Sequence, residues 1–132
     1  MANEAVCIET PTIFERKIIA DGVTIPFGSI MNLSSDPNTV TISSGNDVFG
    51  GIMWVVKDAN DGIVEAVVAM NGVWDLKDSG AGMALGNICE LNGVNLVRTL
   101  VEASVVLGKQ VGKVQETASA SEVVRVKVGS MF

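Results

Sequence analysis

The chain has 132 residues, the length of one domain, and carries a net charge of −6 with a mean hydropathy of +0.41. Its 48% hydrophobic and 18% charged residues exclude intrinsic disorder over most of its length, and no apolar run is long enough for a membrane helix. The nine basic residues are scattered, so we predict that the protein binds neither nucleic acid nor an anionic membrane.

Residues 1–12 are rich in polar side chains, lack a long apolar run and contain Pro11, which predicts a flexible N-terminal arm without a secretory signal peptide. Residues 13–132 are expected to form a single β-rich domain. The chain's 21 valines favour strands, because β-branched side chains fit a pleated sheet. Turn signals built on Gly, Asn and Asp recur about every ten residues, which predicts a mainly antiparallel all-β fold, a small β-barrel or β-sandwich. The sequence shows no internal repeat.

The predicted strands alternate with these turn signals along the whole chain. In order, they are residues 13–20, 29–33, 39–43, 48–56, 63–70, 73–76, 88–91, 94–99, 111–115 and 123–128. Asp61-Gly62 predicts a hairpin turn between two strongly apolar strands, and Asn92-Gly93 predicts a second hairpin. Apolar residues after Asn95 also fit a helical stripe, so one short helix near residues 99–107 is the alternative there.

Two strands carry the clearest information on burial. In the strand at 123–128, valines alternate with Arg125 and Lys127, which predicts that the valines face the core and the two cations face solvent. The stretches 48–56 and 63–70 are apolar on both faces. We therefore expect these two strands to be central in the fold or to meet another subunit.

The residue types that usually perform catalysis are scarce. The chain contains no His and no Tyr, and Cys7 and Cys89 are too few for a thiolate zinc site, so they are interpreted as two buried thiols. The glycines at 80–86 lack the spacing of a dinucleotide-binding loop, and residues 58–62 lack the ligand order of a calcium loop. We predict no enzyme activity, no cofactor and no metal site.

One short motif nevertheless invites comparison with an enzyme. Gly72-Val73-Trp74-Asp75 resembles the catalytic hairpin of trimeric dUTP pyrophosphatases, in which an Asp activates water and a following Tyr stacks on the deoxyribose. This chain has no Tyr to fill the second role. A dUTP pyrophosphatase-like enzyme is therefore a minor alternative.

A longer pattern of glycines and apolar residues runs through residues 13–128. It includes Ile-Pro-Phe-Gly-Ser-Ile-Met at 25–31, Phe-Gly-Gly-Ile-Met at 49–53, and Ala-Met-Asn-Gly-Val-Trp-Asp-Leu at 69–76. Near the end, Val-Gly-Lys-Val-Gln-Glu at 111–116 is followed by the valine-rich strand at 123–128. This order of features resembles the lambda-type head decoration (capsid cement) proteins of tailed bacteriophages.

The resemblance implies a small β-rich protein that forms homotrimers and binds the major capsid protein on the outer surface of an icosahedral phage head. Such a protein is made in the host cytoplasm and stabilises the expanded head in the virion. We place the capsid contact at the start of the chain; the residues concerned are Glu4, Val6, Ile8, Pro11, Ile13 and Phe14. The main alternative is a non-catalytic β-barrel module of another phage or cellular assembly.

Overall fold

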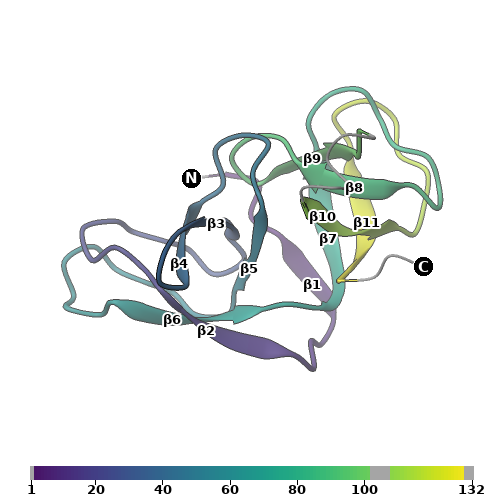
Figure 1. The fold of residues 1–132 in the computed structure, drawn as a ribbon. Coiled ribbons are helices and arrows are strands. Elements are labelled where there is room, and N and C mark those ends of the chain that lie inside the picture. The colour runs from purple at the N-terminus through teal and green to yellow at the C-terminus, as the bar shows by residue number, and fades with distance from the viewer. Residues whose placement is uncertain (1, 102–107, 130–132) are drawn as a thin grey trace.

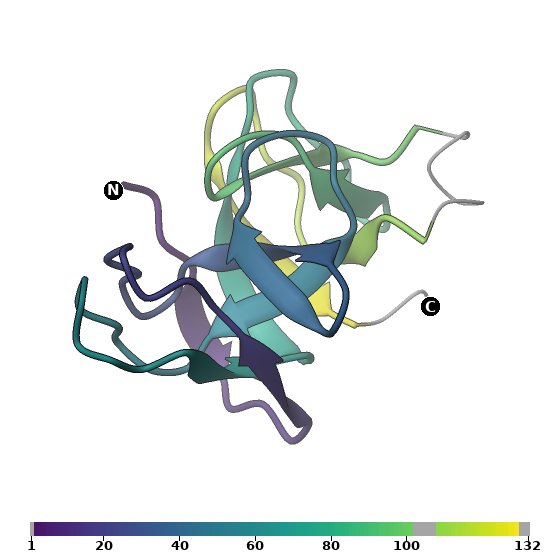
Figure 2. The same ribbon diagram turned by 60° about the vertical axis from the view of Figure 1, so that its left-hand side comes forward.

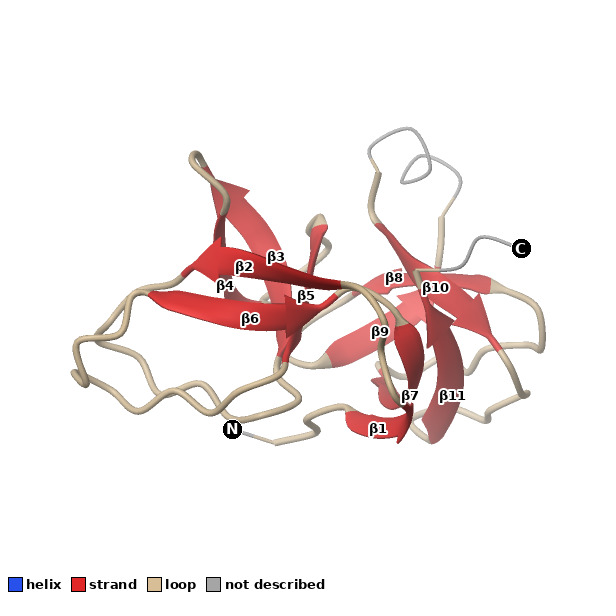
Figure 3. Ribbon diagram, turned by 90° about the horizontal axis from the view of Figure 1, so that it is seen from below, coloured by secondary structure: helices blue, strands red, loops and turns tan. Residues whose placement is uncertain are grey.

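All regular structure in the described residues, 2–101 and 108–129 of this computed structural model, is β-strand (Figures 1 and 3). The strands are β1 (Val6–Glu9), β2 (Phe14–Ile18), β3 (Ile30–Ser35), β4 (Thr39–Ile42), β5 (Phe49–Met53), β6 (Glu65–Ala69), β7 (Gly72–Asp78), β8 (Ile88–Leu91), β9 (Leu96–Thr99), β10 (Gln110–Val114) and β11 (Val123–Val128). The prediction of an all-β fold is confirmed, and of the two predicted architectures, barrel or sandwich, the structure has the barrel. Both predicted hairpins form, β5 with β6 and β8 with β9.

The strands close into two small barrels that lie side by side (Figure 3). The first barrel has the strand order β2-β4-β3-β5-β6, with β6 returning to β2. The second has the order β7-β9-β8-β10-β11, with β11 returning to β7. Each barrel contains one parallel pair, β2 with β4 and β7 with β9, and all its other pairs are antiparallel.

The two barrels are therefore a tandem repeat of one topology, in which β7 to β11 take the places of β2 to β6. The equivalence extends to single residues. The isolated bridge between Ile25 and Lys57 in the first barrel matches that between Met83 and Ala118 in the second. The β3–β5 and β8–β10 pairs both have a register shift, and it falls at matching positions.

The expectation of no internal repeat is thus wrong at the level of structure. The repeat is difficult to see in the sequence because the matched positions share little more than glycine and apolar character. Gly51 and Gly112 are one such matched pair, and at both a Cβ atom would come within 2.5 Å of a neighbouring strand. Glycine at this position is required by the close approach of strands inside each barrel.

The two barrels share much of their hydrophobic core. One cluster of buried side chains joins Ile30, Ile52 and Ala69 of the first barrel to Trp74 and its neighbours in the second. A smaller cluster, which includes Met31, Met53 and Val68, lies within the first barrel. Only two residues separate β6 from β7, so the barrels are fixed to each other by the chain as well as by side-chain contacts.

Buried polar contacts also cross between the barrels. Asn95, which is fully buried and has a φ of 56°, accepts the backbone N–H of Ile30 with its Oδ1 at 2.8 Å. Its own backbone N–H donates to Ser43 Oγ at 3.0 Å, and its Nδ2 donates to the carbonyl of Ala2 at 3.0 Å. Because each of these groups would be costly to bury alone, the contacts fix the relative position of the barrels.

The N-terminal segment is more ordered than the prediction of a flexible arm over residues 1–12 allowed. Strand β1 pairs antiparallel with β7, beside which it lies in Figures 1 and 2. Ala5 is buried, and its backbone N–H donates to the carbonyl of Gly28 in the first barrel at 2.8 Å. The arm prediction is therefore wrong for residues 5–9. The alternative helix near residues 99–107 lies largely outside the described residues, although Thr99 is in β9.

Candidate functional site

Four of the six residues predicted to contact a capsid present apolar side chains to solvent. Val6 and Ile8, on β1, are 58% and 40% exposed, and Ile13 and Phe14, at the start of β2, are 55% and 42% exposed. Cys7, between the first two, packs against the shared core, so β1 is anchored by one face while the other is open. The exposed apolar residues are thus held on ordered backbone.

The other two predicted contact residues contribute less. Pro11 is buried, and Glu4 is half-buried. Sequence reasoning could not distinguish them from their neighbours, because it treated residues 1–12 as one flexible segment. In the structure, the turn that leads from β1 to β2 is fixed by Asn71, whose Oδ1 accepts the backbone N–H groups of Thr12 and Ile13 at 2.9 Å each.

An aromatic cluster at the junction of the barrels extends this apolar surface, and the sequence analysis missed it. The ring of Trp54 lies 5.4 Å from Phe14, 5.1 Å from Phe27 and 5.9 Å from Trp74, measured between ring centroids. Trp74 is fully buried, whereas Phe27 is 39% exposed. These rings come from four separate segments, so no local sequence pattern brings them together.

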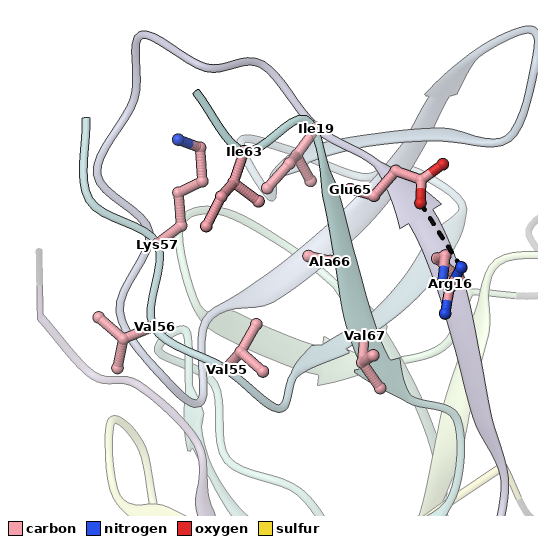
Figure 4. Close-up of a pocket in the computed structure, with 9 residues that line it drawn as sticks. All are labelled: Arg16, Ile19, Val55, Val56, Lys57, Ile63, Glu65, Ala66 and Val67. Carbon is pink, nitrogen blue, oxygen red and sulfur yellow. Dashed lines mark ion pairs between the residues drawn. The ribbon is translucent and has the colours of Figure 1, made fainter. Parts of the chain in front are cut away.

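A groove of about 360 Å³ lies beside β6 in the first barrel (Figure 4). Figure 4 shows it between β6 and the segment that follows β5. Its lining residues are Arg16, Ile19, Val55, Val56, Lys57, Ile63, Glu65, Ala66 and Val67. Most of these are apolar, and Val55, Val56 and Ile63 are 40%, 64% and 51% exposed. Arg16 and Glu65 form an ion pair at 3.8 Å on one side.

A charged cluster surrounds Lys57, one of the residues that line the groove. Lys57 is only 1% exposed, and its ammonium group donates to Asp21 Oδ1 at 2.8 Å, to the carbonyl of Asp58 at 2.8 Å and to Asp61 Oδ1. Hydrogen bonding to Lys57 lowers the pKa of Asp61, and the two carboxylates raise the pKa of Lys57 against the opposing effect of desolvation. With all its donors engaged, this lysine organises the 57–63 loop.

The residues that resemble a dUTP pyrophosphatase motif have structural contacts in this fold. Gly72, Val73, Trp74 and Asp75 lie within β7 rather than at a hairpin turn. Asp75 Oδ1 accepts a hydrogen bond from Arg125 Nε at 3.1 Å, and this bond raises the pKa of Arg125. The indole N–H of Trp74 donates to the carbonyl of Asn71 at 3.1 Å.

The glycine-rich loop at 80–86 and the two thiols are likewise engaged in the fold. Asp78 Oδ2 accepts the backbone N–H groups of Gly80 and Gly82 at 3.1 and 2.8 Å, which ties the loop to β7. Cys7 and Cys89 are free thiols; Cys89 is fully buried, as predicted, and Cys7 is half-buried. Burial raises the pKa of Cys89 to about 12.

Within residues 2–101 and 108–129, no three His, Cys, Asp or Glu side chains are grouped so that they could hold a metal ion. The same residues contain no helix that could cross a membrane. No protein-family model matches the sequence, and no curated protein matches it either. Function is therefore inferred from the residues and their geometry.

Proposed function

We propose that this protein is a structural virion protein that binds the outside of an icosahedral phage capsid and stabilises the expanded head. The observation that supports this most is the set of exposed apolar side chains on β1 and at the start of β2, namely Val6, Ile8, Ile13 and Phe14. Exposed apolar side chains held on ordered backbone are typical of a protein–protein contact surface. The order of glycine and apolar segments that resembles phage decoration proteins agrees with it.

The rigidity of the surface suits a cementing role. β1 is paired with β7 of the second barrel, and Ala5 is hydrogen-bonded to Gly28 of the first, so the contact surface spans both barrels. A load applied at β1 would pass into the shared core instead of stretching a loose tail. The net charge of −6 would also disfavour binding to encapsidated DNA.

The proposed partners are the major capsid protein and further copies of this chain, in a homotrimer. The many exposed large hydrophobic side chains, Val94 and Val123 of the second barrel among them, favour burial in a symmetric assembly. Sedimentation equilibrium would give the mass of the assembly directly. A monomer at micromolar concentration would contradict the trimer without affecting capsid binding.

The first test of the proposed function is quantitative mass spectrometry of purified particles from the virus that encodes the gene. Hundreds of copies per particle, in a simple ratio to the major capsid protein, are expected. Absence from the particle would refute the proposal. In a second test, expanded shells that lack the protein are titrated with the wild type and with a Val6→Ser, Ile8→Ser variant, which should bind at least tenfold more weakly.

A matched control for that titration is Leu85→Ser. Leu85 is 66% exposed, more than Val6, but it lies in the second barrel, in the loop between β7 and β8. Equal losses for the two variants would show that binding depends on general surface hydrophobicity and would contradict the assignment of β1 as the contact.

A further inference from the structure

The groove beside β6 has the features of a site for an added β-strand. We propose that it binds an extended segment of the capsid shell protein, which pairs with the open edge of β6 and places apolar side chains between β6 and Val55-Val56. The identity of the partner rests on the proposed function. The chemistry of the site rests only on the residues that form it.

The edge of β6 is open where it borders the groove. β5 pairs with β6 at Ala69 and Val68, and the last hydrogen bond between the two runs from the backbone N–H of Trp54 to the carbonyl of Val67 at 3.0 Å. Beyond it the chain turns away, and among the described residues no backbone hydrogen bond joins Val55 or Val56 to β6. Because alternate residues of a strand direct their backbone groups to the same side, Val67 and Glu65 both face the groove.

The second barrel shows how the same edge is closed. There, the backbone N–H of Gln115 donates to the carbonyl of Arg125 at 2.8 Å. This hydrogen bond matches the one from the backbone N–H of Trp54 to the carbonyl of Val67 in the first barrel. The next residue, Glu116, then accepts the backbone N–H of Arg125 with its side-chain Oε1 at 3.2 Å. The position that matches Glu116 in the first barrel is Val55, which has no acceptor. The repeat therefore serves as an internal comparison, with one edge capped and the other open.

The side chains around the groove define the chemistry of the occupant. Val55, Val56 and Ile63 form apolar walls, and Ile19 and Ala66 are buried at its base. In strand addition, backbone hydrogen bonds supply affinity, and alternate side chains of the added strand enter pockets. An occupant with valine or isoleucine at alternate positions fits these walls.

Charge favours basic residues at the remaining positions of the occupant. Residues 1–70, which include the first barrel, contain nine carboxylates and three basic side chains, whereas residues 71–132 contain six of each. The whole net charge of −6 therefore belongs to the part of the chain that holds the groove. Glu65 lies at the rim, paired only at 3.8 Å with Arg16. We accordingly commit to a shell-protein segment that alternates apolar and basic residues.

The test uses a variant that copies the closed edge of the second barrel. Val55→Glu places at this position the residue type that caps Arg125, so the fold should be retained while the edge of β6 is filled. The control is Val64→Glu, which adds the same charge at a residue that is 52% exposed and lies outside the groove. A second variant, Val56→Ser, removes one apolar wall without adding charge. Circular dichroism and thermal unfolding establish that each variant is folded.

The probe is a capped octapeptide of alternating lysine and valine, titrated into the full-length protein and followed by calorimetry and amide NMR shifts. We expect wild type and Val64→Glu to bind equally, Val56→Ser to bind several-fold more weakly, and Val55→Glu to bind at least tenfold more weakly. The same peptide with alternate backbone nitrogens methylated should also bind the wild type at least tenfold more weakly. Unchanged binding by Val55→Glu or by the methylated peptide, or no binding by wild type, would overturn the strand-addition proposal.

Binding to expanded shells separates this inference from the proposed function. If wild type binds shells and Val55→Glu binds with the same affinity, the groove is not used by the shell protein, while the decoration role remains. If wild type does not bind shells, the decoration role fails, and with it the identity of the partner. If Val55→Glu instead reduces the oligomeric mass in sedimentation, the occupant is a second copy of this chain, which would also overturn the proposal.

Discussion

Replacement of Gly112 by Ala should destabilise the protein strongly, although it adds a single methyl group. Gly112 lies in β10 opposite Val128 and has an ordinary negative φ, so the effect would be steric and not conformational. A Cβ atom at this position would lie 2.3 Å from the backbone oxygen of Lys127 and 2.8 Å from the Cα of Val128. Both contacts are with the backbone of β11, which cannot rotate away as a side chain would.

The magnitude follows from how far β11 must move. Ordinary van der Waals contact begins near 3.4 Å, so the strand has to shift by about 1 Å. β11 is paired on its other side with β7 along its full length, and its inward valines are fully or nearly fully buried, so that shift disturbs the shared core. Overpacked cores lose about 1–3 kcal/mol, and we expect about 3 kcal/mol here because the backbone itself must move.

Urea unfolding followed by tryptophan fluorescence measures this loss, with Gly22→Ala as the control. Gly22 also has no positive φ, and its nearest non-neighbour atom to an added Cβ is a side-chain oxygen at 3.8 Å, so its replacement should be nearly neutral. Because the core crosses both barrels, Gly112→Ala should lower the midpoint of a single transition without changing its slope. A loss below about 1 kcal/mol, or a separate transition for one barrel, would refute the reasoning.

Three further predictions concern titratable and buried polar groups. Burial raises the pKa of Cys89 to about 12, so this thiol should not react with a thiol reagent at pH 8 until the protein unfolds. Cys7 is half-buried and should react slowly in the native protein. Fast labelling of both thiols would contradict the burial of Cys89. Because Lys57 lowers the pKa of Asp61 below its ordinary 3.8, the stabilisation from this pair is present above that pH and is lost as the pH falls. The difference in Tm between wild type and Lys57→Met should therefore shrink below pH 4. A difference that stays constant with pH would contradict a stabilising ion pair between Lys57 and Asp61. Asn95→Gly keeps the positive φ but removes the side chain that accepts a buried N–H, and should cost about 1–3 kcal/mol by chemical denaturation; a neutral result would show that water replaces the amide.

Local patterns were sufficient to predict the strands of both barrels, although not β1. The alternation of valine with Arg125 and Lys127 correctly placed the valines inside, and Asp61-Gly62 and Asn92-Gly93 lie between paired strands. These features depend on residues that are neighbours in the sequence. The closure of the strands into two barrels depends on the parallel pairs β2–β4 and β7–β9, and nothing in either strand's sequence indicates its partner.

The candidate sites depend even more than the fold on contacts between residues that are far apart in the sequence. Val6 and Phe14 could be chosen from the sequence because they belong to the segment predicted to be the contact arm, but the order of β1 depends on pairing with β7, more than sixty residues away. The groove could not be predicted at all. Val55 and Val56 read as part of a continuous apolar strand, and only the departure of the chain from β6 after Trp54 leaves them lining a surface.

The tandem repeat gives a physical reason for the division of charge along the chain. Two barrels of one topology have the same requirements for glycine, turns and inward valines, so selection for the fold acts on both alike. What differs is free to serve function. Residues 1–70, which include the first barrel, carry the whole net charge, and that barrel has an open strand edge at Val55; residues 71–132 are neutral, and the matching edge of the second barrel is capped by Glu116. If the first barrel is the half that engages a partner, then Glu116→Val should open the matching edge in the second barrel. That variant should gain a second site for the lysine–valine peptide, weaker than the first because the surrounding charge is absent, and a stoichiometry that stays at one per chain would show that the edge alone does not make the site.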